Sequence, residues 1–129
     1  MKILDSDHYV ALLRGQLDLR AFAAPDERLA ITAISVAELT HGVHKSARRS
    51  DNLARLDVLF ASVEILPFDA GASRRFGLLK ANLERQGNLI ADLDLQIACI
   101  AVDRGLTLVT HNQRHFKRVP GLALEDWIP

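Results

Sequence analysis

Short apolar segments that alternate with longer amphipathic segments constrain the fold of this chain more than any other feature. The apolar segments predict strands at 2–5, 29–32, 63–66 and 106–109, with an edge strand at 122–125. The segments between them predict helices at 8–13, 16–24, 35–46, 50–61, 70–86 and 93–104. This alternation indicates an α/β fold with a central parallel sheet that helices cover on both faces.

Single residues set several helix boundaries. Pro25 limits the helix predicted over 16–24, because the residue before a proline resists helical geometry. Ser35 is the predicted N-cap of the next helix, and Glu38 three residues later completes a capping-box pattern. Gly105 is the predicted stop of the helix over 93–104.

The composition favours a single domain, residues 1–129, with a continuous core, since 49% of the residues are hydrophobic. Sixteen Lys and Arg residues balance sixteen Asp and Glu residues, which excludes a strongly basic, sequence-independent nucleic-acid binder. Cys99 is the only cysteine, so we expect a buried structural thiol rather than a disulfide. With no signal segment or membrane-length apolar run, we expect a soluble cytoplasmic protein.

Four polar residues lie where the predicted sheet would gather them at one edge: Asp5, Glu38, Asp94 and Asn112. Asp5 ends the first strand, Asn112 follows the strand over 106–109, and the other two begin helices. Ligands of open parallel sheets bind at the carboxyl ends of the strands. The sequence therefore predicts an oxygen-rich pocket at this edge.

Three carboxylates in one pocket repel one another, so they favour a hard divalent cation such as Mg²⁺ or Mn²⁺. We expect Asp5 and Asp94 to be direct ligands, and Glu38 to bind the ion or to orient the attacking water as a general base. Asn112 offers a neutral carbonyl oxygen. Such an ion would polarise a phosphodiester and help to activate water.

Each of these residues also has a purely structural interpretation. Glu38 could serve only as a helix-capping residue, Asp94 could serve the helix dipole, and Asn112 could be an ordinary turn residue. Asp92 competes with Asp94 and is equally plausible as the N-cap. Asp5 is the hardest to explain in this way, because a carboxylate that ends a buried strand is costly without a partner.

Four separated motifs resemble those of PIN-domain ribonucleases, especially VapC-type toxins. ILDSDHYVALL resembles their first motif and SVAELTHGVHKS their second, while IADLDLQIACIAVDRGLTLVTHNQRHFKRVPGLALEDW resembles the third and fourth motifs with the tail. The resemblance spans the chain from end to end. It places the family's acidic positions at Asp5, Glu38 and Asp94, with Asn112 at the fourth.

The resemblance implies a three-layer α/β/α fold and a divalent-metal-dependent endoribonuclease that leaves a 5′-phosphate and a 3′-hydroxyl. It also implies a cognate antitoxin, an RNA substrate and a homodimer. Family members differ at the fourth position, where this chain has the neutral Asn112, so the number of ions stays open. Asp92 occupies a subsidiary acidic position seen in some members and could compensate.

Other polar clusters carry weaker signals. His41 and His44, or His111 and His115, would need further ligands to bind zinc, and His111 could instead contact substrate. Two basic clusters could position RNA phosphates or form solvated faces; they comprise Lys45, Arg48 and Arg49, and Arg114, Lys117 and Arg118. The apolar stripes of the helices over 35–46 and 50–61 fit either a core or an antitoxin-binding surface.

Two other functions compete with the nuclease. The ILDSD segment also fits the opening of a haloacid-dehalogenase-type phosphatase with an aspartate nucleophile, although the later lysine and acidic pair of that class have no convincing counterpart. A non-catalytic PIN-like scaffold that binds RNA or protein is the other alternative. The neutral Asn112 favours it, and the retained Asp5, Glu38 and Asp94 argue against it.

Overall fold

All strands lie in one parallel sheet at the centre of the molecule. The computed structural model describes residues 1–129. The strands are β1 (Lys2–Leu4), β2 (Leu29–Thr32), β3 (Glu64–Leu66), β4 (Thr107–Val109) and β5 (Leu124–Glu125). They are ordered β3-β2-β1-β4-β5, and every neighbouring pair is parallel.

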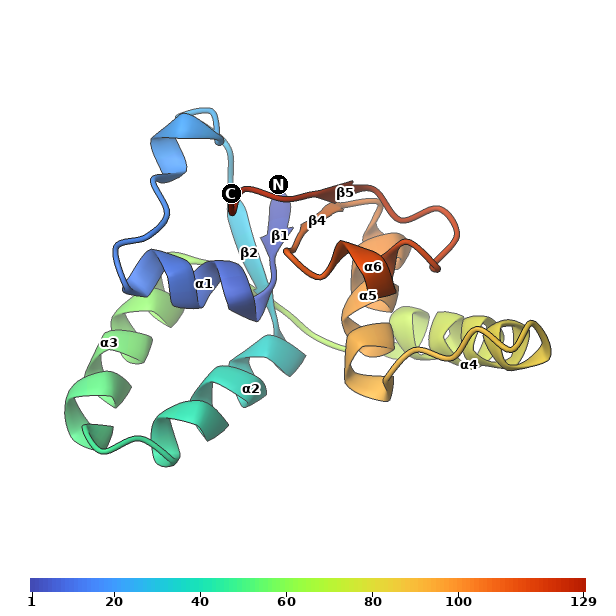
Figure 1. Ribbon diagram of the computed structural model, residues 1–129, viewed down its shortest axis with the longest axis horizontal. Coiled ribbons are helices and arrows are strands. Elements are labelled where there is room, and N and C mark those ends of the chain that lie inside the picture. The colour runs from blue at the N-terminus through green and yellow to red at the C-terminus, as the bar shows by residue number, and fades with distance from the viewer.

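Helices cover both faces of this sheet (Figure 1). One face packs against α1 (Ser6–Leu13), α2 (Ala33–His44) and α3 (Arg49–Ser62). The other packs against α4 (Ala70–Arg85), α5 (Asp92–Arg104) and α6 (Gln113–Phe116). The fold is therefore the expected three-layer α/β/α arrangement. None of the helices combines the length and the apolar character that a membrane crossing requires.

The alternation of side chains along the strands builds two separate cores. Ile3 and Leu108 point to the α4–α5 side, while the next residues, Leu4 and Val109, point to the α1–α3 side. All four side chains are fully buried. Because both faces of β1 and β4 are covered, these strands are apolar throughout, and the first polar side chains come directly after each strand.

Three local predictions need correction. The helix predicted over 16–24 is only a short 3₁₀ helix, Leu19–Ala21, because Asp18 accepts a hydrogen bond from the Arg20 N–H and closes a single turn. Thr32, not Ser35, caps α2, since the Thr32 hydroxyl accepts the Ser35 N–H at 3.1 Å. Helix α6 was not predicted at all.

Two other local predictions are confirmed. Gly105 ends α5 in the left-handed region, with φ of 65°, which a residue without a Cβ adopts easily. Cys99, a residue of α5, is a free and fully buried thiol in the core on the α4–α5 side of the sheet.

The strand order creates a natural binding edge. The chain leaves β1 toward β2 on one side, whereas β4 lies on the other side of β1, so the direction of winding reverses between β1 and β4. Parallel sheets bind ligands outside the carboxyl ends of the strands at such a reversal. Helix α5 leads back into β4, so its first turn lies at this same edge.

Candidate active site

Asp5 lies at the centre of this edge, directly after β1. Its side chain caps α1 by accepting the Ser6 N–H at 2.9 Å, and its other oxygen accepts the Thr110 hydroxyl at 2.8 Å. Only 8% of the residue is exposed. The capping geometry and the bond to the neighbouring strand hold this carboxylate at the point where the winding of the sheet reverses.

Glu38 approaches Asp5 from α2. Because the helix begins at Ala33, Glu38 lies in its second turn rather than in the first turn, where the capping-box prediction put it. Its Oε1 accepts the Ser6 hydroxyl at 3.1 Å. Ser6 thus joins the Asp5 cap to Glu38, and the capping interpretation of Glu38 is wrong.

Asp94 reaches the edge from the first turn of α5. It is half-buried, and its nearest cationic partner is His115 of α6, with Oδ2 and Nδ1 3.8 Å apart. Asp92 is directed elsewhere, because its carboxylate binds the Lys80 ammonium of α4 at 2.9 Å and is mostly exposed. The N-cap position itself is Ala91, so the prediction of Asp92 as the cap is wrong.

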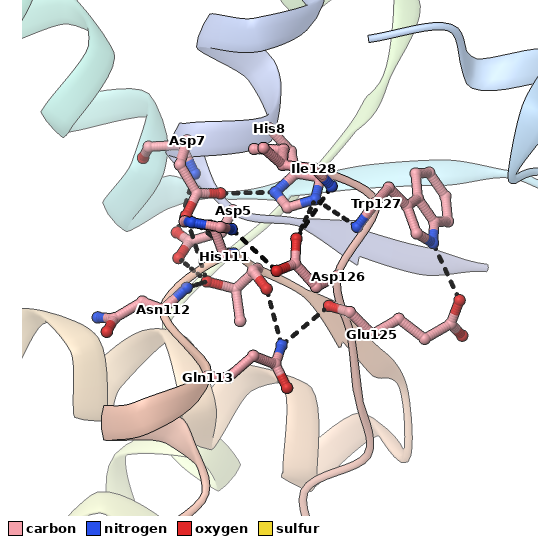
Figure 2. Close-up of polar contacts among 12 residues, drawn as sticks. Asp5, Asp7, His8, His111, Asn112, Gln113, Glu125, Asp126, Trp127 and Ile128 are labelled. Atoms are coloured by element: carbon pink, nitrogen blue, oxygen red, sulfur yellow. Dashed lines mark hydrogen bonds and ion pairs between the residues drawn. The ribbon is translucent and has the colours of Figure 1, made fainter.

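Asn112 precedes α6 at the same edge, but its amide faces His115. Its Nδ2 lies 3.1 Å from His115 Nδ1, and its backbone N–H donates to the Thr110 hydroxyl. It makes no hydrogen bond to Asp5, Glu38 or Asp94. Figure 2 shows its amide extending away from Asp5.

The sequence interpretation overlooked Asp7, a further acid of this edge. Asp7 Oδ1 lies 2.6 Å from His8 Nδ1, and Asp7 Oδ2 accepts the His111 N–H at 3.0 Å (Figure 2). Asp7 is the last residue of the ILDSD segment. Spacing could have identified it, because Asp7 lies in the first turn of a helix that starts at the edge.

Burial and like charges together set the electrostatics of the edge, and burial is the larger effect. Burial and the neighbouring charge of Asp7 raise the pKa of Asp5 from 3.8 to about 6, with Glu38 contributing in the same direction. The hydrogen bonds from Thr110 and Ser6 favour the charged form but do not outweigh these effects. Asp5 in the ion-free protein therefore holds its proton well above the usual range of an aspartate.

The pKa values of Glu38 and Asp94 are raised as well. Burial raises the pKa of Glu38 against the hydrogen bond from Ser6, and the charges of Asp94 and Asp7 add to the rise. Burial also raises the pKa of Asp94 against the nearby His115, again with help from Asp7. The charge of Asp7 thus acts on all three predicted acids, which shows that the four carboxylates share one neighbourhood.

The pKa of Asp7 is lowered, in contrast to those of the other three acids. Burial would raise its pKa, but the hydrogen bonds from His8 and from the His111 N–H outweigh burial and hold the pKa below its usual value. Asp7 is therefore the most firmly ionised member of the group.

The donor set fits a hard divalent cation held largely through water. Carboxylate oxygens are the ligands that Mg²⁺ and Mn²⁺ prefer, and mutual repulsion gives these acids a reason to bind a cation. However, no group of three or more His, Cys, Asp or Glu side chains is arranged so that it could hold a metal ion directly. Mg²⁺ commonly keeps several waters and uses only one or two carboxylates, so a site of this kind does not need three direct protein ligands.

The remaining predicted residues lie apart from the acids or at their margin. His41 and His44 are in the last turn of α2, at the far end from the site, and no zinc-binding group exists there. Lys45, Arg48 and Arg49 lie beyond that end of α2, while Arg114, Lys117 and Arg118 lie in and directly after α6, beside the site. His111 binds Asp126 through Nδ1 at 2.9 Å.

A groove of about 430 Å³ extends from the acidic edge between α1, α2 and α3. Glu38 and Ser6 line it where it meets the acids, and apolar side chains line its length. Arg14 and Arg55 provide positive charge, and the Arg55 guanidinium donates to the carbonyl of Leu13. The groove thus joins the site to an apolar surface with basic residues.

Known proteins resemble this chain in sequence and in structure. The PIN domain family model matches residues 2–122. Ribonuclease VapC2 of Rickettsia felis is 40% identical over 104 residues, covering 81% of this chain and 78% of that protein. The tRNA(fMet)-specific endonuclease VapC of Shigella flexneri is 38% identical over 100 residues, covering 78% of this chain and 76% of that protein.

Two solved toxin–antitoxin structures share the fold closely. VapBC2 from Rickettsia felis, bound to a promoter DNA fragment, superposes with a TM-score of 0.89 at 35% identity, covering 98% of both chains. DNA-bound VapBC from Salmonella typhimurium gives a TM-score of 0.90 at 32% identity, covering 98% of this chain and 99% of that chain. This chain therefore belongs to the PIN-domain family, among its VapC ribonucleases. That membership leaves the haloacid-dehalogenase alternative without support.

Proposed function

We propose that this protein is a divalent-metal-dependent endoribonuclease and the toxin of a cytoplasmic toxin–antitoxin pair. The observation that carries the proposal is the gathering of Asp5, Glu38 and Asp94, with raised pKa values, at the carboxyl edge of the sheet. The relatives named as ribonucleases and as a tRNA-specific endonuclease support an RNA substrate. A non-catalytic scaffold would have no need to keep these like charges together.

The side chains divide the work according to their placement. Asp5 and Asp94 would hold the ion, with Glu38 positioned by Ser6 at the border of the groove. When bound, the divalent cation would neutralise these acids and polarise a phosphate oxygen of the substrate. Arg114 and Lys117 are exposed beside the site and would bind neighbouring phosphates.

Glu38 is the group that we assign to proton transfer. It is only half-buried, so it can face water, and its raised pKa makes it a better proton acceptor than an ordinary glutamate. Water would then add to phosphorus as the bond from phosphorus to the 3′ oxygen breaks. The 3′ oxygen would take up a proton, which leaves a 5′-phosphate and a 3′-hydroxyl.

The groove between α1, α2 and α3 is the site that we assign to the antitoxin. It offers apolar contacts from Val10, Leu39 and Leu56, with arginines beside them. A partner helix or strand with apolar side chains and acidic flanks would match this chemistry. Since Glu38 lines the same groove, an occupant would also block the acidic edge. The homodimer stays a prediction, which light scattering of the purified chain tests.

RNA cleavage by the purified protein tests the proposal. We expect cleavage of total cellular RNA with Mg²⁺ or Mn²⁺, loss of cleavage with EDTA, and at least about a 100-fold loss in Asp5→Asn. The asparagine keeps the cap on α1, so circular dichroism should show an intact fold. Cleavage that survives both EDTA and the substitution would contradict a metal-dependent site at Asp5. Mn²⁺ binding without any cleavage would favour the scaffold instead.

A further inference from the structure

The C-terminal segment, residues 125–128, reaches the acidic edge through a buried histidine. His8 is fully buried in α1, and its Nε2 lies 3.0 Å from the backbone nitrogen of Trp127. Its Nδ1 lies 2.6 Å from Asp7 Oδ1. Figure 2 shows His8 between the C-terminal segment and Asp7, with Asp126 beside it.

The backbone contact sets the direction of these hydrogen bonds. The Trp127 nitrogen can only donate, so His8 Nε2 must accept. The neutral ring then carries its hydrogen on Nδ1 and donates it to Asp7. A proton on Nε2 would place two donors against each other and leave the buried Trp127 N–H unsatisfied, which is costly. His8 is therefore a fixed donor aimed at Asp7.

The C-terminal segment is itself anchored to the edge. The Thr110 N–H donates to the Glu125 carbonyl at 2.9 Å, and Gln113 bridges the carbonyls of Thr110 and Glu125. Asp126 binds the ring of His111. The segment is thus tied to the loop between β4 and α6, from which the His111 N–H donates to Asp7.

The two carboxylate oxygens of Asp7 are held from opposite sides. Oδ1 accepts from His8, and Oδ2 accepts from the His111 N–H at 3.0 Å. Each oxygen can accept more than one hydrogen bond, and 35% of the side chain is exposed. Asp7 Oδ2 also lies 3.5 Å from the Thr110 hydroxyl, which donates to Asp5 Oδ2 at 2.8 Å. Asp7 is therefore held in a fixed orientation beside Asp5 and keeps lone pairs that could bind a cation.

We propose that Asp7 is a further carboxylate of the cation site and that the C-terminal segment positions it there through His8. Asp7 supplies the negative charge that the neutral Asn112 does not contribute. Asp7 binds the cation directly or through one of its waters, and His8 is a positioning residue that acts through Asp7. This inference rests on the proposed function, because it concerns the same cation site.

Mn²⁺ binding to the purified full chain, measured by calorimetry without RNA, provides the first test. We expect Asp7→Asn to weaken Mn²⁺ binding about 10-fold or more, the usual range for groups that support metal ligands. Asp57→Asn is the matched control, because it makes the same change on an exposed position of α3. Asp7 is one-third exposed, so the variant should fold, which thermal unfolding checks.

Two substitutions of His8 separate its two hydrogen bonds. His8→Gln can keep an acceptor near Trp127 N but removes the donor to Asp7, whereas His8→Asn can keep the donor and removes the acceptor. We expect His8→Gln to weaken Mn²⁺ binding about 10-fold and His8→Asn to recover most of that affinity, even if its midpoint of thermal unfolding is lower. A purely structural role would make affinity follow stability in both variants.

The double variant Asp7→Asn/His8→Gln completes a double-mutant cycle for Mn²⁺ affinity. If His8 acts through Asp7, the double variant should bind Mn²⁺ as Asp7→Asn does, with no added loss. Wild-type affinity in Asp7→Asn, or independent losses in the double variant, would overturn the inference. If His8→Gln does not fold, Asp7→Asn alone decides. A wild-type protein that binds no Mn²⁺ would instead refute the proposed function.

Discussion

The two ends of the central sheet arrange charge in opposite ways. Around the amino ends of β1, β2 and β3, acids are paired with cations at short distances. The pairs are the N-terminal amine with Glu27 at 3.0 Å and Arg28 with Glu64 at 2.7 Å. These contacts neutralise charge and are ordinary contributors to a folded surface.

At the carboxyl ends of the strands, acids lie among acids. No lysine or arginine forms an ion pair with Asp5, Glu38, Asp94 or Asp7. The basic neighbours of the group are two histidines, His115 at 3.8 Å from Asp94 and His8 at 2.6 Å from Asp7. The raised pKa values show that this arrangement costs free energy of folding. Of these two regions, only the carboxyl edge keeps carboxylates close to one another. A cation bound there would reduce their mutual repulsion.

The largest expected difference in RNA cleavage is between substitutions of two aspartates of α5. Asp94 lies in the acidic group, whereas Asp92 binds Lys80 on α4. We expect Asp94→Asn to reduce Mg²⁺-dependent RNA cleavage by at least about 100-fold, because it removes a carboxylate that would hold the proposed ion. Asp92→Asn should cleave within about twofold of the wild type, since it affects only an exposed ion pair with Lys80. Initial cleavage rates of a labelled RNA provide the measurement. Equal losses in both variants would contradict the division of roles along this helix.

The pH dependence of stability should show the cost of burying the Asp5 carboxylate beside other acids. Because the pKa of Asp5 is raised in the folded state, the folded protein binds the proton more tightly than the unfolded chain. This contribution to stability is fully present below about pH 4 and is lost as the pH rises through about 6. We expect the free energy of unfolding without divalent ions to fall over this interval, by at most about 3 kcal/mol from Asp5. Urea titrations with EDTA measure it.

The stability of the Asp5→Asn variant provides a second test of the cost of the Asp5 charge. The substitution removes the charge but keeps a side chain that can cap α1, so the variant should be more stable than the ion-free wild type at neutral pH. Saturating Mn²⁺ should stabilise the wild type and leave the variant nearly unchanged. A wild type whose stability does not vary between pH 4 and pH 6 would be incompatible with the cost of the Asp5 charge described above.

Removing an ion pair at the amino end of the sheet should have the smallest effect on stability and on Mn²⁺ affinity. Arg28→Met removes the contact with Glu64, and we expect a loss of under about 1 kcal/mol, because both side chains are largely exposed. Mn²⁺ affinity should not change. Urea titration and calorimetry together check this prediction, and a large loss of Mn²⁺ binding would show that the two ends of the sheet are coupled.

The order of the elements was predictable because apolar strands and glycine stops are local signals. The segments that became β1, β2, β3 and β4 are buried runs, and Gly105 is where a helix can end with a positive φ. Parallel pairing then places residues after β1 and β4 at one edge, together with the start of α5. The neighbourhood of Asp5 and Asp94 followed from these rules without any knowledge of the contacts.

The remaining features depend on contacts between residues that are distant in sequence. Nothing in the local pattern around His8 shows that it meets the backbone of Trp127, because 119 positions separate them. The orientation of Asn112 toward His115 and of Asp92 toward Lys80 likewise depends on tertiary packing. The cap of α2 was misplaced because Thr32 and Ser35 are both good N-cap residues, and only the observed hydrogen bond distinguishes them.

The location of Mn²⁺ in crystals of the purified protein tests the central claim most directly. Anomalous scattering from Mn²⁺-soaked crystals should show an ion at the carboxyl edge of the sheet, within ligand distance of Asp5 or Asp94 and with waters completing its shell. Manganese bound only elsewhere, or absent from this edge at saturating concentration, would contradict the account.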